Sequence, residues 1–143
     1  FFIYLGLPAQ SSPKEIVKVF FEYYEKNPME AIDFLYQTNH WIDPESSLVK
    51  ELKSNLKSNI PRMGDYLDQR FLGRSIVAKN LQVRVYVVRY ERQPLRFTFH
   101  FYKSTDKLNQ SKERWKIYRF NFDDFLFEDM EENMKFNYLN SLN

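Results

Sequence analysis

The chain of 143 residues contains no cysteine. Disulfide bonds, thiol nucleophiles and zinc sites built on cysteine are therefore excluded. Glycine is also scarce, with three residues, and none belongs to a glycine-rich loop that wraps a phosphate group. Because there are six prolines and no low-complexity tract, most of the chain is expected to be ordered.

Long hydrophobic runs and a dominant charge are missing as well. No stretch approaches the roughly 20 apolar residues that a transmembrane helix needs. The 21 basic and 19 acidic side chains leave a net charge of +2, which is too balanced for the footprint of a protein that binds duplex nucleic acid. We therefore expect no transmembrane segment and no nucleic acid partner.

Core-forming residues are abundant, since aromatic side chains make up 18% of the chain. Each fully buried Phe or Leu contributes roughly 1.5–3 kcal/mol to stability. A chain of this length buries an adequate core without disulfides or metal. The sequence thus predicts one domain, spanning residues 12–143.

The first eleven residues have a pattern of their own. An apolar run from Phe1 to Leu7 leads to the small residues Ala9 and Ser11. This arrangement is typical of the end of a secretory signal, with cleavage near Ser11. We interpret residues 1–11 as a signal-peptide remnant and expect export to the periplasm or the medium. The alternative is an N-terminal segment that packs on the domain.

Three helix starts share the same local sequence signals. Ser12-Pro13-Lys14-Glu15 offers a hydroxyl N-cap, a first-turn proline and a glutamate three residues after the cap. Asn27-Pro28-Met29-Glu30 repeats the device and ends the first helix. Asp43-Pro44-Glu45-Ser46 is a third, weaker start, and Asn59-Ile60-Pro61 interrupts the helical spacing that follows it.

The hydrophobic spacing changes to two-residue alternation from about Arg74. Segments rich in Val, Ile, Phe and Tyr predict strands at residues 74–78, 81–91, 95–102 and 115–122. The turn Arg92-Gln93-Pro94 predicts an antiparallel hairpin, residues 104–114 a solvated loop, and residues 123–143 a short helix with a frayed end. The fold class is therefore α+β, with N-terminal helices packed on a curved, cone-like antiparallel β-meander.

Alternation also assigns side chains to the two faces of the sheet. We expect the following residues to face the helices: Leu81, Val83, Val85, Val87, Phe97, Phe99, Phe101, Tyr118, Phe120 and Phe122. Ile117 would then lie on the opposite face. That face is expected to carry the candidate ligand or partner residues: Arg84, Tyr86, Arg96, His100, Tyr102 and Arg119.

Cations interleaved with aromatic rings can hold an anionic or planar ligand, or another protein. The alternative is a solvated or self-associating face whose long side chains cover neighbouring rings. Binding of single-stranded nucleic acid is a weaker third interpretation of the same alternation.

The segments Pro94–Lys103 and Trp115–Asp124, joined by a polar loop, are similar to the paired terminal strands of small exported bacterial members of the nuclear transport factor 2-like (cystatin-like) superfamily. The resemblance extends from Pro13 to about Phe127. It implies a sheet that curls around the helices into a cone, whose open end holds a pocket in enzymes and is filled in many non-enzymes. It also implies dimerisation through the sheet face, as in many members.

A catalytic cone would need a carboxylate base inside an apolar cavity and a Tyr or protonated Asp facing it. Only Asp33, Asp65 and Asp68 lie near apolar positions, and exposed helix or turn sites explain them. Bulky rings at the mouth of the cone would favour interaction instead, and the side chains that we expect to act as plugs are Tyr24, Tyr36, Trp41 and Trp115.

His40 falls near the end of the second helix, where it would act as a cap. His100 has no second ligand at metal-binding spacing. We therefore expect no metal and no cofactor. The sequence favours an exported, non-catalytic module that binds a small molecule or a protein, with a small-molecule isomerase or cyclase as the first alternative and an envelope assembly or stress partner as the second.

Overall fold

The computed structural model describes residues 11–105 and 113–142. Residues 1–10 of the predicted signal remnant, which was expected to span residues 1–11, and most of the predicted polar loop lie outside this range. The elements follow the order α1 (Pro13–Lys26), α2 (Pro28–Gln37), α3 (Ser47–Met63), β1 (Tyr66–Val77), β2 (Leu81–Tyr90), β3 (Pro94–Ser104), β4 (Arg114–Asp123) and α4 (Leu126–Ser141).

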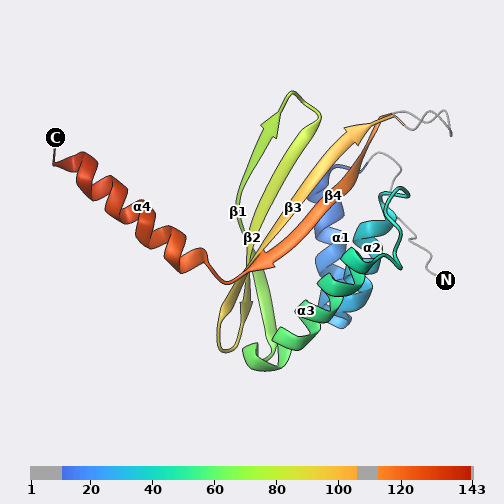
Figure 1. The fold of residues 1–143 in the computed structure, drawn as a ribbon, viewed down its shortest axis with the longest axis horizontal. Coiled ribbons are helices and arrows are strands. Elements are labelled where there is room, and N and C mark those ends of the chain that lie inside the picture. Colours follow the sequence, from blue (N-terminus) through green and yellow to red (C-terminus); the bar gives the residue numbers. More distant parts are fainter. Residues whose placement is uncertain (1–10, 106–112, 143) are drawn as a thin grey trace.

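The four strands form one antiparallel sheet in the order β1-β2-β3-β4. Helices α1, α2 and α3 lie on one side of this curved sheet, and α4 extends from the end of β4 on the other side (Figure 1). The predicted α+β class and the meander are therefore confirmed. We call the face toward α1–α3 the inner face and the opposite one the outer face.

The helix starts are formed by the expected caps. Ser12 Oγ accepts a hydrogen bond from Glu15 N at 3.2 Å, and Ser12 N donates to Glu15 Oε1 at 3.3 Å, which completes the capping box. Asn27 ends α1 and caps α2, because its Oδ1 accepts from Met29 N at 3.0 Å. The third helix begins slightly later than expected, with Ser46 as its cap.

Helix α3 and strand β1 extend further than the sequence predicts. Helix α3 continues through Pro61 to Met63, since a proline in the last turn removes only one helical hydrogen bond. Strand β1 begins at Tyr66, earlier than the predicted start at Arg74. Irregularities in its pairing between Tyr66 and Asp68, and between Phe71 and Gly73, interrupt the two-residue alternation. These irregularities conceal the first half of β1 in the sequence.

The face assignment predicted for β2 is wrong. Tyr86 pairs with Phe97 and Arg84 with Phe99, whereas Val83 pairs with His100. Directly opposite residues lie on one face of a sheet, so Tyr86 and Arg84 share the inner face with the phenylalanines. Val83, Val85 and Val87 lie on the outer face. The placement of Phe97, Phe99 and Phe101 in the core is confirmed.

The length of the β2–β3 turn explains this inversion. A three-residue turn at 92–94 would pair odd-numbered residues of β2 with odd-numbered residues of β3, which places the valines opposite the phenylalanines. In the structure the last pair is Arg89 with Pro94, so residues 90–93 form the connection. One additional residue in the connection reverses the face of every side chain on β2 relative to β3.

A bulge changes the alternation of β4 as well. Ile117 pairs with Phe101 and Arg119 with His100, so Tyr118 is the extra residue between them. Ile117 is therefore buried, while Tyr118 is 66% exposed, which corrects the expected positions of both residues. Phe120 and Phe122 are on the inner side as predicted.

The end of α2 stabilises this part of β4. Thr38 Oγ1 accepts a hydrogen bond from Ile117 N at 2.9 Å, and Asn39 Nδ2 donates to Ile117 O at 2.8 Å. His40, exposed, lies beyond the end of α2, with its ring centroid 4.8 Å from that of Trp41.

Aromatic rings fill the space between α1 and the sheet. The centroid of Phe20 lies 5.1 Å from that of Phe99 and 5.6 Å from that of Phe120. At one end of this cluster the hydroxyl groups of Tyr24 and Tyr90 are hydrogen-bonded to each other. Burial raises the pKa of Tyr24 well above its usual range and that of Tyr90 to about 12.

We expect Gly64→Ala to destabilise the corner between α3 and β1. Gly64 has φ of +83°, and an added Cβ would lie 2.9 Å from Glu91 Cβ. The substitution should lower the free energy of unfolding by about 1–3 kcal/mol, the usual cost of a strained backbone site.

Gly73→Ala is the matched control, because a Cβ added at Gly73 meets no atom within 4 Å. Its effect should be within about 0.5 kcal/mol, as for other surface substitutions. Urea denaturation of both variants measures the difference. Equal losses in the free energy of unfolding would contradict a strained backbone at Gly64.

Candidate functional site

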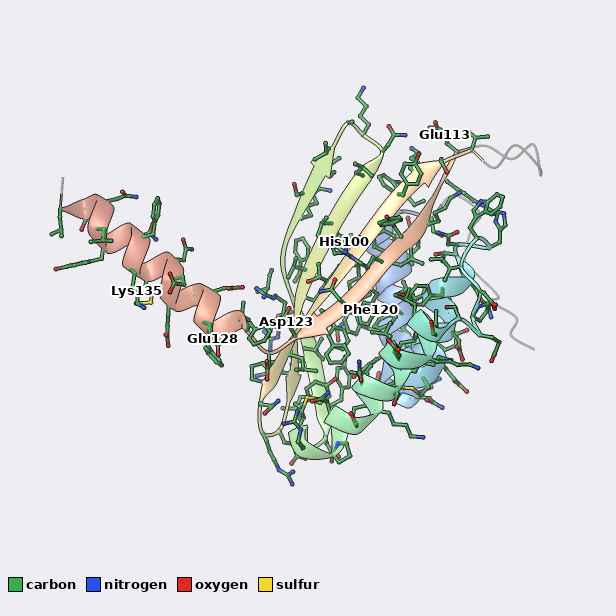
Figure 2. The ribbon with its side chains drawn as sticks, in the orientation of Figure 1. His100, Glu113, Phe120, Asp123, Glu128 and Lys135 are labelled. Atoms are coloured by element: carbon green, nitrogen blue, oxygen red, sulfur yellow. The ribbon has the colours of Figure 1, made fainter. Side chains whose placement is uncertain are left out.

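The outer face of the sheet is the candidate site. Its residues include Gly73 and Ser75 of β1, Leu81, Val83, Val85 and Val87 of β2, Arg96, Thr98, His100 and Tyr102 of β3, and Arg119 of β4, all placed by strand pairing, together with Tyr118 at the β4 bulge. Helices α1–α3 lie on the other side (Figure 1). Figure 2 marks Phe120 on the helical side, and His100 on β3.

Val83, Val85 and Val87 form a continuous apolar row along β2, which we call the valine row. On one side of it, Gly73 pairs with Val85 and Ser75 with Val83. These small residues leave the flank of the valine row open. A helix or an extended segment could therefore approach the backbone of β1 closely.

The valine row leads to a pocket of about 350 Å³. Its lining residues are Leu81, Gln82, Val83, His100, Phe101, Tyr102 and Tyr118. The β4 bulge places Tyr118 on this wall, which two-residue alternation did not predict. The walls are mainly aliphatic and aromatic, so the pocket suits an apolar group.

His100 is the titratable group of this pocket. Its Nδ1 atom is buried and has no hydrogen-bond partner in the part of the chain that the structure describes. Burial, reinforced by the positive charge of Arg119 on the neighbouring strand, lowers the pKa of His100 below its ordinary value of 6.5. The imidazole is therefore largely neutral at pH 7 and compatible with an apolar occupant.

Basic residues surround the apolar centre of the outer face. Asp68 is held by Arg89 through two hydrogen bonds of 2.6 and 2.7 Å, which together with Arg70 keep the pKa of Asp68 far below its usual range. Arg96 contacts Asp123 at 3.0 Å and Asp129 of α4 at 2.6 Å. Arg119 is exposed and has no ion pair within the described residues.

The six residues predicted as a single face are divided between the two faces. Arg96, His100, Tyr102 and Arg119 lie on the outer face. Arg84 and Tyr86 instead lie on the inner face, 4% and 7% exposed. The valine row and Tyr118 lie on the outer face, although the sequence pattern predicted them in the core. The correct length of the β2–β3 turn would have predicted the outward position of the valines.

Contacts with neighbouring side chains hold the guanidinium of Arg84 on the inner face. Its Nε donates to Tyr86 Oη at 2.9 Å and its Nη1 to Gln82 Oε1 at 3.1 Å. The guanidinium also lies 4.5 Å from the centroid of the Phe71 ring. Two hydrogen bonds and an aromatic face offset part of the cost of burying the cation.

The interior offers little acid–base chemistry. The buried polar and charged residues in the described ranges are Ser11, Asn39, Gln82, Arg84 and Lys116, and no carboxylate is among them. Asp33 pairs with Lys53 at the surface, and Asp65 is exposed. Within residues 11–105 and 113–142, no group of three His, Asp or Glu side chains is placed to hold a metal ion.

The four aromatic side chains that were expected to plug the cone differ in their burial. Tyr24 and Tyr36 are buried, and Trp115 packs partly buried against the core. Trp41 is 67% exposed and fills no interior space. Three of the four expected plugs therefore contribute to the interior, together with phenylalanine rings and aliphatic core residues.

Helix α4 is the second exposed apolar feature. It has 16 residues, and none is buried. Phe127, Met130, Met134 and Tyr138 lie within one broad stripe at helical spacing and are all at least half exposed. The sequence predicted only a short helix with a frayed end here, because tail composition does not reveal where a helix stops.

The chain matches no protein-family model, no curated protein and no solved structure. Across the described ranges, no helix combines the length and the apolar composition that crossing a membrane requires.

Arg84→Ala should lower the free energy of unfolding by about 1–3 kcal/mol, because Tyr86 and Gln82 lose a buried hydrogen-bond donor. Arg119→Ala, on the exposed outer face, should change it by less than about 0.5 kcal/mol. Urea denaturation of the two variants tests the face assignment directly. An Arg84→Ala variant whose free energy of unfolding is unchanged would show that Arg84 does not lie in the interior.

We expect His100 to titrate below pH 6.5 in an NMR titration of its imidazole resonances, and Arg119→Gln to raise its pKa by removing a nearby positive charge. A folded-state pKa below the unfolded value means that the unfolded chain binds the proton more readily. The contribution of His100 to stability is therefore present above about pH 6.5 and is lost as the pH falls. An unchanged pKa in Arg119→Gln would contradict the proximity of the two groups.

Proposed function

We propose that the protein is a non-catalytic interaction module whose outer sheet face binds an amphipathic segment of a protein. The observation that supports this proposal is the valine row and its adjoining apolar pocket on a sheet face that no described helix covers. A contiguous apolar surface bordered by charges is typical of interaction sites.

The dimensions of the pocket indicate how a partner would be anchored. At about 350 Å³ it lies near the lower limit of ligand pockets, and it can accommodate a large apolar side chain. Buried anchors of this type dominate many protein interfaces. The exposed cation Arg119 beside the pocket favours a segment that carries acidic residues around its apolar anchor.

The enzyme alternative lacks a comparable basis. It required a carboxylate in an apolar cavity, and the buried polar groups of the described interior include none. The rings of Phe20, Phe99 and Phe120 occupy the space where such a cavity would lie. We therefore place the function on the outside of the sheet.

Two further parts of the proposal rest on sequence patterns. Export depends on the apolar run and small residues of 1–11. Membership of the nuclear transport factor 2-like superfamily depends on the strand segments quoted above and is supported by the order of three helices followed by a meander. Neither is needed for the outer face to bind a partner.

A display selection of short peptides against the full chain tests the proposed function. We expect enrichment of peptides that combine an aromatic or leucine anchor with acidic residues. Fluorescence anisotropy of a selected peptide should show at least about tenfold weaker binding to Val85→Glu, equivalent to about 1.4 kcal/mol.

Lys57→Glu, which places the same side chain on the exposed surface of α3, is the control and should bind the peptide unchanged. Circular dichroism should show that both variants are folded. Selected peptides that bind Val85→Glu as tightly as the unsubstituted chain would overturn the proposal. So would a selection that enriches no peptide with either the full chain or a Met130→Glu, Met134→Glu variant, in which the exposed stripe of α4 cannot compete for the face.

A further inference from the structure

We infer that the segment that occupies the outer face is α4 of a second copy of this chain, so that two chains exchange their C-terminal helices. This inference rests on the proposed function, because it names the partner of that same face. It is supported by the exposure, direction, length and charge of α4.

Exposure is the first argument. Most helices in proteins are stabilised by tertiary packing of an apolar face rather than by helix propensity. Helix α4 has 16 residues and no buried side chain. Its stripe nevertheless includes Phe127, Met130 and Met134, with Met134 70% exposed. A helix of this composition requires a surface to cover its stripe.

Direction is the second argument. Phe125 N donates to Asp123 Oδ1 at 2.9 Å, and Arg96 holds both Asp123 and Asp129. These contacts fix the first turn of α4 relative to the end of β4. From there α4 extends away from its own sheet, on the side opposite α1–α3 (Figure 1). A second chain that faces the outer face is therefore in a position to receive it.

Complementarity is the third argument. Around the valine row, the outer face carries Arg70, Arg89, Arg96 and Arg119 against the acidic Asp68 and Asp123. Helix α4 carries four acidic residues, Glu128, Asp129, Glu131 and Glu132, against Lys135. The opposite net charges favour docking of the helix on the face of another chain.

Size agrees with this arrangement. Sixteen helical residues extend about 24 Å and the ten residues of β2 extend about 33 Å, so the strand is long enough for the whole helix. The valine row, from Val83 to Val87, covers about 13 Å of this length, which is close to the roughly 10 Å between Phe127 and Met134 along α4. Gly73 and Ser75 permit close approach of the helix beside Val85 and Val83. The pocket next to His100 can then receive a large side chain of the stripe.

Exchange also explains why a second copy is the appropriate partner. In a twofold dimer each chain donates one helix and offers one face, so the valine row and the α4 stripe of both chains are covered. The contact closes on itself and leaves no equivalent surface for a third chain. Such reciprocal exchange is a common route to homodimers.

The first test measures the mass of the full chain by light scattering after size-exclusion chromatography. We expect twice the chain mass of 17.5 kDa. Met130→Glu with Met134→Glu should weaken dimerisation at least about tenfold, since both charges enter the apolar contact. Phe136→Glu is the matched control: Phe136 is 63% exposed on the opposite side of α4, so its substitution should leave the dimer intact.

The second test uses the absence of cysteine from the chain, which makes introduced thiols unambiguous. Chains carrying Val85→Cys are mixed with differently tagged chains carrying Met134→Cys and oxidised. We expect a disulfide between the two tags, and none when Phe136→Cys replaces Met134→Cys. This result would place the stripe of one chain on the valine row of another.

Three results would overturn the inference: a monomer at all concentrations tested, a dimer that the paired methionine substitution leaves intact, or a disulfide that forms only within one chain of a Val85→Cys, Met134→Cys double variant. The proposed function fails separately, by the peptide selection. If peptides bind the Val85 surface while the chain stays monomeric, the outer face is an interaction site for another protein.

Discussion

The pairing of β2 with β3 decides which side chains of this sheet meet the helices. Residues 90–93 connect the last paired residues, Arg89 and Pro94, and this length fixes the parity of every pair along the hairpin. Tyr86 and Val88 consequently enter the core beside Phe97 and Leu95. The same constraint turns the valine row outward and creates the apolar outer face on which the proposed function depends.

The inner face tolerates this register because its polar members are satisfied locally. Arg84 lies opposite Phe99, yet its guanidinium finds Tyr86, Gln82 and the ring of Phe71. Around it the aromatic cluster of α1 and the central strands excludes water. Two hydrogen bonds and an aromatic ring offset part of the cost of burying this cation, which allows it to lie in one layer with the rings.

This arrangement leaves two apolar surfaces that no other described part of the chain covers. The valine row is one, and the stripe of α4 is the other. They lie on the same side of the molecule, and Arg96 connects them because it sits on β3 and binds Asp129 in the first turn of α4. A single side chain thus orients the helix relative to the face. This geometry favours contact between molecules over closure within one chain.

Much of the architecture follows from the sequence itself, because helix caps and hydrophobic spacing are local. Ser12 and Asn27 act as the caps that their neighbours imply, and the phenylalanines of β3 face the core as alternation requires. The faces of β2 and of Tyr118 were decided only by tertiary structure. Val83 and Val88 are equally apolar, so local patterns cannot choose between them. Turn length and the β4 bulge, which depend on contacts between distant segments, make that choice.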